Sequence, residues 1–265
     1  MKIIIDPTLT TAPYDNVTSC VASTEDADFP DENMRDNFTK NVWKATGSTA
    51  TIHVQCNKGS SVCIINTNAT SVVIKAGSGD SYTPESGFAY EAGFVDADDE
   101  VATIVVSDLS GEHGLAWADY SEFTLPHLLT IELETDGDPV EVGVLRAGKV
   151  EEFADPAYNY SEGSIDFSIE KELNNGADYF KKRNVVRVFD NLEMIETRVN
   201  AWKFKHDIFD HIGPQPVVIR MVQNDNITDD EAACFVAYVK RSEPPRLQHL
   251  TISHTRINYS LKEAI

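Results

Sequence analysis

Seven histidines are the residues of this chain best suited to metal binding or acid–base chemistry. Two pairs lie close in sequence, His206 with His211 and His249 with His254, and the members of each pair are five residues apart. Metal ligands on one face of a helix are four residues apart, and strand residues five apart point to opposite faces. Neither spacing suits a shared metal ion, so we expect no metal site.

A nucleophilic hydrolase would show an activated serine or cysteine, but the chain has no G-x-S-x-G sequence. The GEHG sequence at 111–114 is more typical of an exposed loop tip, and GSG at 77–79 lacks the lysine of a phosphate-binding loop. Paired carboxylates for glycoside hydrolysis stay open, since so acidic a chain offers many pairs. We expect no catalytic residues and no cofactor.

Sugar binding needs a flat aromatic ring for stacking, with polar neighbours for the hydroxyl groups. Trp117 with Tyr120, in the loop-like sequence AWADYSEF, is the strongest candidate for a ligand-binding site. Trp43 is the next candidate, with a place in the core as its alternative. Trp202 is expected in the core or in an interface.

The charge of the chain excludes one class of partner. Its 265 residues include 22 Lys+Arg and 43 Asp+Glu, a net charge of -21. Nucleic acid is not expected as a partner, because phosphate contacts need clustered Lys and Arg. An anionic membrane surface is disfavoured for the same reason. Residues 1–150 have a net charge of -16 and residues 151–265 of -5, which suggests two units with different surfaces.

The N-terminal sequence MKIIIDPTLT has an apolar run of three residues, too short for a signal peptide. No segment has the length of a transmembrane helix, so we expect synthesis in a cytoplasm and no membrane insertion. The cysteines at 20, 56, 63 and 234 lack C-x-x-C spacing and are expected to be buried free thiols, with a Cys56–Cys63 disulfide as the alternative. Acidic loops at 25–32 and 96–100 lack calcium-site spacing and are expected to be solvated.

Residues 1–150 read as β structure. Residues 49–56 (TATIHVQC) alternate apolar and polar, and further short strands are expected at 61–66, 71–75, 101–107, 128–134 and 140–145. The TDGD sequence at 135–138 predicts a hairpin between the last two. Short strands without a long helical pattern indicate a sandwich or jelly roll.

Residues 151–265 are expected to form a smaller α+β domain. Strands are predicted at 164–171, 184–190, 216–222, 233–240 and 247–259. Residues 192–212 have apolar side chains at helical spacing, but β-branched residues up to Val199 favour a strand. We therefore expect a strand to about 199 and a helix over 201–212, ended by Gly213.

Several sequence segments resemble those of known protein families. DENMRDNFTKNVWKATG (31–47), VCIINTNATSVVI (62–74) and LLTIELETDGDPVEVGVLRAGKV (128–150) resemble parts of galactose-binding-like jelly rolls. Together with GSIDFSIEK (163–171), RVFDNLEMIETRV (187–199) and QPVVIRMV (215–222), they resemble tailed-bacteriophage proteins that join such a domain to a smaller α+β domain.

The resemblance implies a structural component of a bacteriophage virion, at the distal tail or baseplate. Its partners would be other tail proteins and further copies of itself, and its location the virion. A glycan- or receptor-binding module for host adsorption is the alternative, and a glycan-cleaving hydrolase comes third. Because residues 151–265 are less acidic, we expect them to dock to the tail while residues 1–150 face outward.

Overall fold

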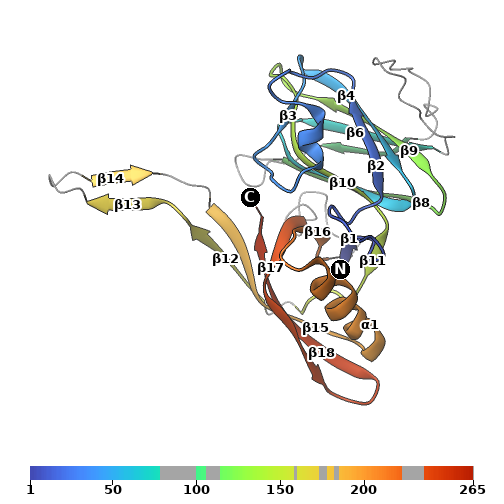
Figure 1. Ribbon diagram of the computed structural model, residues 1–265, viewed down its shortest axis with the longest axis vertical. Coiled ribbons are helices and arrows are strands. Elements are labelled where there is room, and N and C mark those ends of the chain that lie inside the picture. The colour runs from blue at the N-terminus through green and yellow to red at the C-terminus, as the bar shows by residue number, and fades with distance from the viewer. Residues whose placement is uncertain are drawn as a thin grey trace. The chain divides into compact units, whose positions relative to one another are not determined.

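The computed structural model describes residues 1–77, 100–105, 114–157, 160–172, 178–181, 185–222 and 236–264. The chain divides into two compact units (Figure 1). The first unit comprises Met1–Glu152 and Val217–Ala237, and the second comprises Phe153–Pro216 and Tyr238–Ile265. Residues 217–237, which the sequence pattern placed with the C-terminal domain, thus belong to the first unit.

The first unit is a sandwich of two antiparallel sheets, which confirms the predicted mainly β jelly-roll class. One sheet has the order β3-β10-β5-β8 and the other β2-β4-β9-β6-β7. The strands are β2 (Val17–Ala22), β3 (Trp43–Lys44), β4 (Thr49–Cys56), β5 (Gly59–Thr67), β6 (Ser71–Gly77), β7 (Glu100–Val105), β8 (Gly114–Phe123), β9 (His127–Glu134) and β10 (Glu141–Gly148).

The described part of the sandwich core includes one face of β4 and residues of β5 that face it. On β4, Ala50, Ile52, Val54 and Cys56 are buried and contribute to it, as their alternation predicted. Facing them, Val62 and Ile64 of β5 join the same cluster. Apolar alternation therefore determines which face of each sheet points inward.

The hairpin predicted at 135–138 is wrong. β9 pairs with β4 and β6, whereas β10 pairs with β3 and β5, so residues 135–140 cross from one sheet to the other. Gly137 has a positive φ of 113°, which is the turn feature that the sequence suggested. The Thr135 amide donates to the Ser48 carbonyl at 2.9 Å, which holds the crossing against another loop.

The described cysteines Cys20, Cys56 and Cys63 are free thiols, as expected. Cys56 and Cys63 are buried, and burial raises the pKa of both thiols. Cys56 lies in the core between the sheets, whereas Cys63 is outside that cluster. Cys234 lies outside the described residues.

Three short strands form a further sheet portion in the first unit. β1 (Lys2–Ile4) pairs on one side with β11 (Val150–Glu152) and on the other with β16 (Val217–Arg220), both antiparallel. Lys2 is the cross-strand neighbour of Arg220. Segments far apart in the sequence thus meet at β1.

The second unit is α+β, as predicted. Its strands are β12 (Ser161–Asp166), β15 (Val185–Thr197), β18 (His254–Glu263) and β17 (Val236–His249), in that order, and a separate pair, β13 (Ile169–Glu172) and β14 (Asp178–Lys181). One helical segment follows β15: the α-helix α1 (Arg198–Trp202) and the π-helical η3 (Lys203–Asp210). Phe204, Ile208 and Phe209 are its buried residues over η3.

The predicted change from strand to helix is confirmed near the expected place. β15 ends at Thr197, whose side chain caps α1 by accepting a hydrogen bond from the Asn200 amide at 3.2 Å. The helical segment ends at Gly213, which has a φ of 61°. The single strand predicted over 247–259 is wrong, because residues 250–253 form a turn between β17 and β18.

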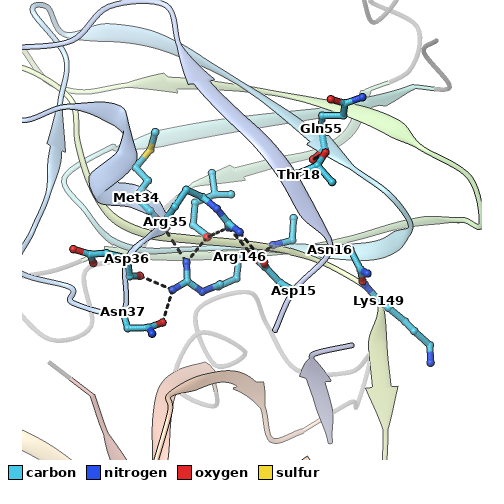
Figure 2. Close-up of polar contacts among 12 residues, drawn as sticks. Asp15, Asn16, Thr18, Met34, Arg35, Asp36, Asn37, Gln55, Arg146 and Lys149 are labelled. Atoms are coloured by element: carbon cyan, nitrogen blue, oxygen red, sulfur yellow. Dashed lines mark hydrogen bonds and ion pairs between the residues drawn. The ribbon is translucent and has the colours of Figure 1, made fainter. Parts of the chain in front are cut away.

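A buried polar network fastens the 3-10 turn η1 (Asp31–Arg35) to β10 (Figure 2). Arg35 donates to both carboxylate oxygens of Asp15, at 2.8 and 2.7 Å, and to the Leu145 carbonyl at 2.8 Å. The neighbouring Arg146 is buried and donates to the carbonyls of Met34, at 3.3 Å, and of Asp36. The two guanidinium groups therefore hold the loop by hydrogen bonds, alongside the burial of Met34 in the core.

We predict that Asp15→Ala lowers the free energy of unfolding by about 3 kcal/mol. The Asp15 side chain is only 2% exposed, and its removal leaves the Arg35 charge without its bidentate partner. The matched control is Glu141→Gln, which breaks the more exposed Lys44–Glu141 pair and should lower the free energy of unfolding much less. Urea unfolding measures both. Equal losses would show that the Asp15–Arg35 pair does not stabilise the loop.

Candidate binding surfaces

Two of the three predicted aromatic residues lie in the sandwich core. Trp43 is fully buried, and its indole N–H donates to the Thr24 carbonyl at 3.2 Å. Tyr120 is 8% exposed, and its hydroxyl lies 3.0 Å from Nε2 of His127. Neither ring offers a face to a ligand. Both residues were assigned to a site because sequence alone does not show which face of a strand is covered.

Tyr120 and His127 form a neutral pair inside the protein. Burial raises the pKa of the Tyr120 hydroxyl and lowers the pKa of His127. Phe123 stacks on the His127 ring with 4.5 Å between the ring centroids. The pair therefore packs the end of the core.

Trp117 lies on β8 and not in the expected loop. Its side chain is partly exposed, because it points to the face of the sheet that is opposite Ala116 and Ala118 of the core. Asp119, two residues further along the strand, lies on the same face, and the Trp117 indole N–H donates to it at 3.0 Å. Trp117 is thus the one predicted aromatic residue that a ligand could reach.

Asp119 collects polar groups from four strands. Lys2 of β1 lies 2.6 Å from its carboxylate, Arg220 of β16 lies 3.5 Å from it, and Ser61 of β5 donates a hydrogen bond to it. Burial opposes ionisation of Asp119, but hydrogen bonds from Lys2, Ser61 and Trp117 outweigh it and lower its pKa. An aromatic ring beside a carboxylate and two cations offers stacking and hydrogen bonding together. No local sequence pattern indicates this cluster, because its members are up to 218 positions apart.

A second candidate feature is a set of exposed apolar side chains. Among the described residues, twelve large hydrophobic side chains are exposed, and nine of them belong to the second unit. Such a concentration of exposed apolar side chains on one unit favours contact with another molecule. The nine are Ile165, Phe167, Phe180, Val185, Ile195, Val199, Trp202, Leu250 and Ile252.

Trp202 belongs to this set. It was expected in the core or in an interface, and it is 58% exposed, so it is not a core residue. Its ring lies 3.9 Å from the His206 ring, centroid to centroid, and His206 is 2.9 Å from Asp210. The interface interpretation of Trp202 stays a prediction.

The net charge divides unevenly between the units. The first unit contains 9 Lys+Arg and 30 Asp+Glu, a net of 9 − 30 = -21, and the second contains 13 of each, a net of 13 − 13 = 0. The whole formal charge of the chain therefore belongs to the sandwich unit. The unit that exposes apolar side chains is neutral.

Within the described part of the chain, no group of three or more His, Cys, Asp or Glu side chains could hold a metal ion. No described helix is long and apolar enough to cross a membrane. The acidic loop at 96–99 and the histidine at 113 lie outside the described residues.

The fold is thus an antiparallel β-sandwich of the class that the sequence resemblance predicts, followed by an α+β unit. No family model and no curated protein matches the chain. One similar solved structure is chitosan-binding module 1 of a chitosanase/glucanase from Paenibacillus sp. IK-5, at 16% identity and a TM-score of 0.34, covering 49% of this chain and 92% of that one.

A carbohydrate-binding module from Clostridium perfringens, solved with GalNAc-β-1,3-galactose, is similar at 11% identity and a TM-score of 0.37, over 49% of this chain and 94% of that one. Reduced XRCC1, solved with the DNA polymerase β catalytic domain, is similar at 17% identity and a TM-score of 0.33, over 51% and 95%. Similarity at this level transfers no ligand to this chain.

We predict that Asp119→Asn makes stability less sensitive to acid. The folded-state pKa of Asp119 is lowered, so its ionised form stabilises the fold above the ordinary carboxyl pKa of about 3.9, and this contribution is lost as the pH falls through the lower folded value. Urea unfolding of the native protein and the variant should differ most above about pH 4 and converge in stronger acid. The exposed-loop control Asp136→Asn should follow the native protein throughout; a constant difference for Asp119→Asn would contradict the assignment.

Proposed function

We propose that this chain is a structural subunit of a larger protein assembly and docks there through its second unit. The observation that carries the proposal is the concentration of exposed apolar side chains on a unit of zero net charge, beside a sandwich unit of -21. Following the sequence resemblance, the assembly we propose is a tailed-bacteriophage virion, at the distal tail or baseplate. Its partners would be other tail proteins and further copies of this chain.

The physical argument concerns which surface can approach a neighbour. Burying a large aliphatic or aromatic side chain that was exposed to water contributes about 1.5–3 kcal/mol. Among the large apolar side chains described in the second unit, Val199 and Ile252 are the most exposed, at 77% and 91%. The first unit repels other copies of itself, which favours solubility and an outward position. The division of charge between the two units therefore supports the proposed arrangement, in which the second unit docks and the sandwich unit faces outward.

A second candidate function is glycan binding by the sandwich unit. It rests on the Trp117 ring beside the Asp119 carboxylate, with Lys2 and Arg220 within ion-pair distance of that carboxylate. An aromatic plane with charged hydrogen-bonding groups is what a carbohydrate needs for stacking and for its hydroxyl groups. Both functions can belong to one virion protein, because they use different units.

The main proposal predicts that the chain is a stoichiometric part of purified particles. Particles would be banded on a density gradient, and the ratio of this chain to the other tail proteins measured by quantitative mass spectrometry. A fixed ratio across independent preparations is expected. Recovery of the chain only in the soluble fraction, with none banding with particles, would refute a structural role.

For the second candidate, a glycan array first identifies the glycans that the full chain binds. We predict that Trp117→Ala weakens binding to these glycans by about tenfold or more, equivalent to at least about 1.4 kcal/mol. The control is Trp202→Ala, which removes an exposed tryptophan from the second unit and should leave the affinity unchanged. Surface plasmon resonance gives both affinities. Equal binding by the two variants would exclude the Trp117 surface as the glycan site.

A further inference from the structure

Four exposed apolar side chains of the second unit lie on α1 and on the turn between β17 and β18, two segments that a backbone hydrogen bond joins. We call this surface the apolar tip and define it as Val199 and Trp202 of α1 with Leu250 and Ile252 of the β17–β18 turn (Figure 1). The Arg198 amide donates to the Ser253 carbonyl at 2.9 Å, which joins the start of α1 to the turn. The four side chains therefore belong to one local structure.

The turn is held in place before any partner arrives. The Thr251 hydroxyl accepts hydrogen bonds from the amides of Ser253, at 3.2 Å, and His254, at 3.0 Å. The Leu250 amide donates to the His254 carbonyl at 3.1 Å, which closes the turn. Ile252 takes part in none of these bonds and is 91% exposed. An ordered turn with an isoleucine at its apex loses little conformational entropy on binding, which favours affinity.

The tip lacks the strong negative charge of the first unit. Residues 195–203 and 246–256 contain Arg198, Lys203, Arg246 and Arg256, against a single acidic residue, the buried Glu196. Arg246 and Arg256 pair with glutamates outside these segments, at 3.1 and 3.0 Å. The tip is therefore neutral to weakly positive, with apolar side chains at its apex.

We propose that the apolar tip docks onto the acidic first unit of a second copy of this chain, in a head-to-tail contact. This inference rests on the proposed function, because it names the partner of the docking unit. Contact between two first units would bring two surfaces of -21 together, and contact between two tips would bring like cations together. Only the head-to-tail contact pairs opposite charge around a buried apolar apex.

An anionic membrane is the other acidic surface that could meet an apolar, basic tip. The first unit of the same molecule would be repelled by it, and its net charge is much larger than that of the tip. Protein is therefore the occupant. A head-to-tail contact uses different patches on the two copies, so repetition closes a ring or extends a filament.

The test compares two substitutions at one exposed position of the full chain. Ile252→Asp removes the apolar apex and adds a charge that the acidic partner repels, whereas Ile252→Lys removes the apex and adds one that it attracts. Light scattering coupled to size-exclusion chromatography over a concentration series gives the association constants. We expect Ile252→Asp to weaken self-association tenfold or more, and to weaken it clearly more than Ile252→Lys. Phe180→Asp, at an exposed phenylalanine of β14 outside the tip, is the control, and thermal melting confirms that each variant is folded.

Zero-length carbodiimide crosslinking of mixed isotope-labelled and unlabelled chains then locates the contact. Crosslinks between copies should join Lys203 to carboxylates of the first unit. Crosslinks confined to second units, equal weakening by Asp and Lys, or retention on vesicles of anionic lipid would overturn the head-to-tail assignment. A native chain that stays monomeric yet bands with particles would overturn this inference and leave the proposed function standing. Absence from particles as well would overturn both.

Discussion

Every strand of a sheet must bury its apolar face against something, and this constraint explains the difference between the two units. In the first unit, each of the two sheets of the sandwich covers the apolar face of the other. Apolar residues from both, with the fully buried Trp43, form one continuous core. The Arg35 and Arg146 network then becomes necessary, because the η1 loop covers the edge of the core with polar backbone that needs hydrogen-bonding partners.

The described part of the second unit has a four-stranded sheet portion and the separate two-stranded sheet of β13 and β14, and its buried aromatic side chains lie between the four-stranded portion and the helical segment. The helical segment covers part of its sheet, with the Phe204 ring 5.1 Å from the Tyr259 ring and 5.1 Å from the Phe153 ring. Apolar side chains outside this contact stay in water: Val199 of the segment itself is 77% exposed, and Ile252 of the β17–β18 turn is 91% exposed. Incomplete layering and zero net charge therefore have a common consequence: the missing layer can be supplied by another molecule without a large electrostatic cost.

Sequence periodicity predicted the strands well and their pairing poorly. Residues 49–56 were predicted as a strand with both ends and the buried face correct, since alternation is a local property. At 135–138, turn residues were read as a hairpin, but Gly137 serves a crossing between sheets, because the same positive φ fits either connection. Turn chemistry tells where the chain reverses and not which sheet it enters.

The candidate surfaces were harder still to predict. Trp117 was placed in a loop and lies on β8, because small and polar neighbours hid its strand, and its role in ligand binding stays a prediction. The groups around Asp119 come from β1, β5, β8 and β16, and no local pattern connects them. The apolar tip was missed because residues 247–259 alternate like one strand, and the turn depends on side-chain bonds from Thr251.

The two buried thiols of the first unit have a use that follows from their positions. Only a thiolate reacts with alkylating reagents, and burial disfavours it at Cys56 and at Cys63 alike. Each cysteine therefore becomes reactive only when the structure around it opens, and the reaction rate counts those openings. Cys56 belongs to the core cluster and Cys63 does not. The alkylation rate of Cys56 would therefore report separation of the two sheets, and the rate of Cys63 would report exposure of an outer face. Alkylation rates at the two cysteines would therefore report two kinds of opening motion separately.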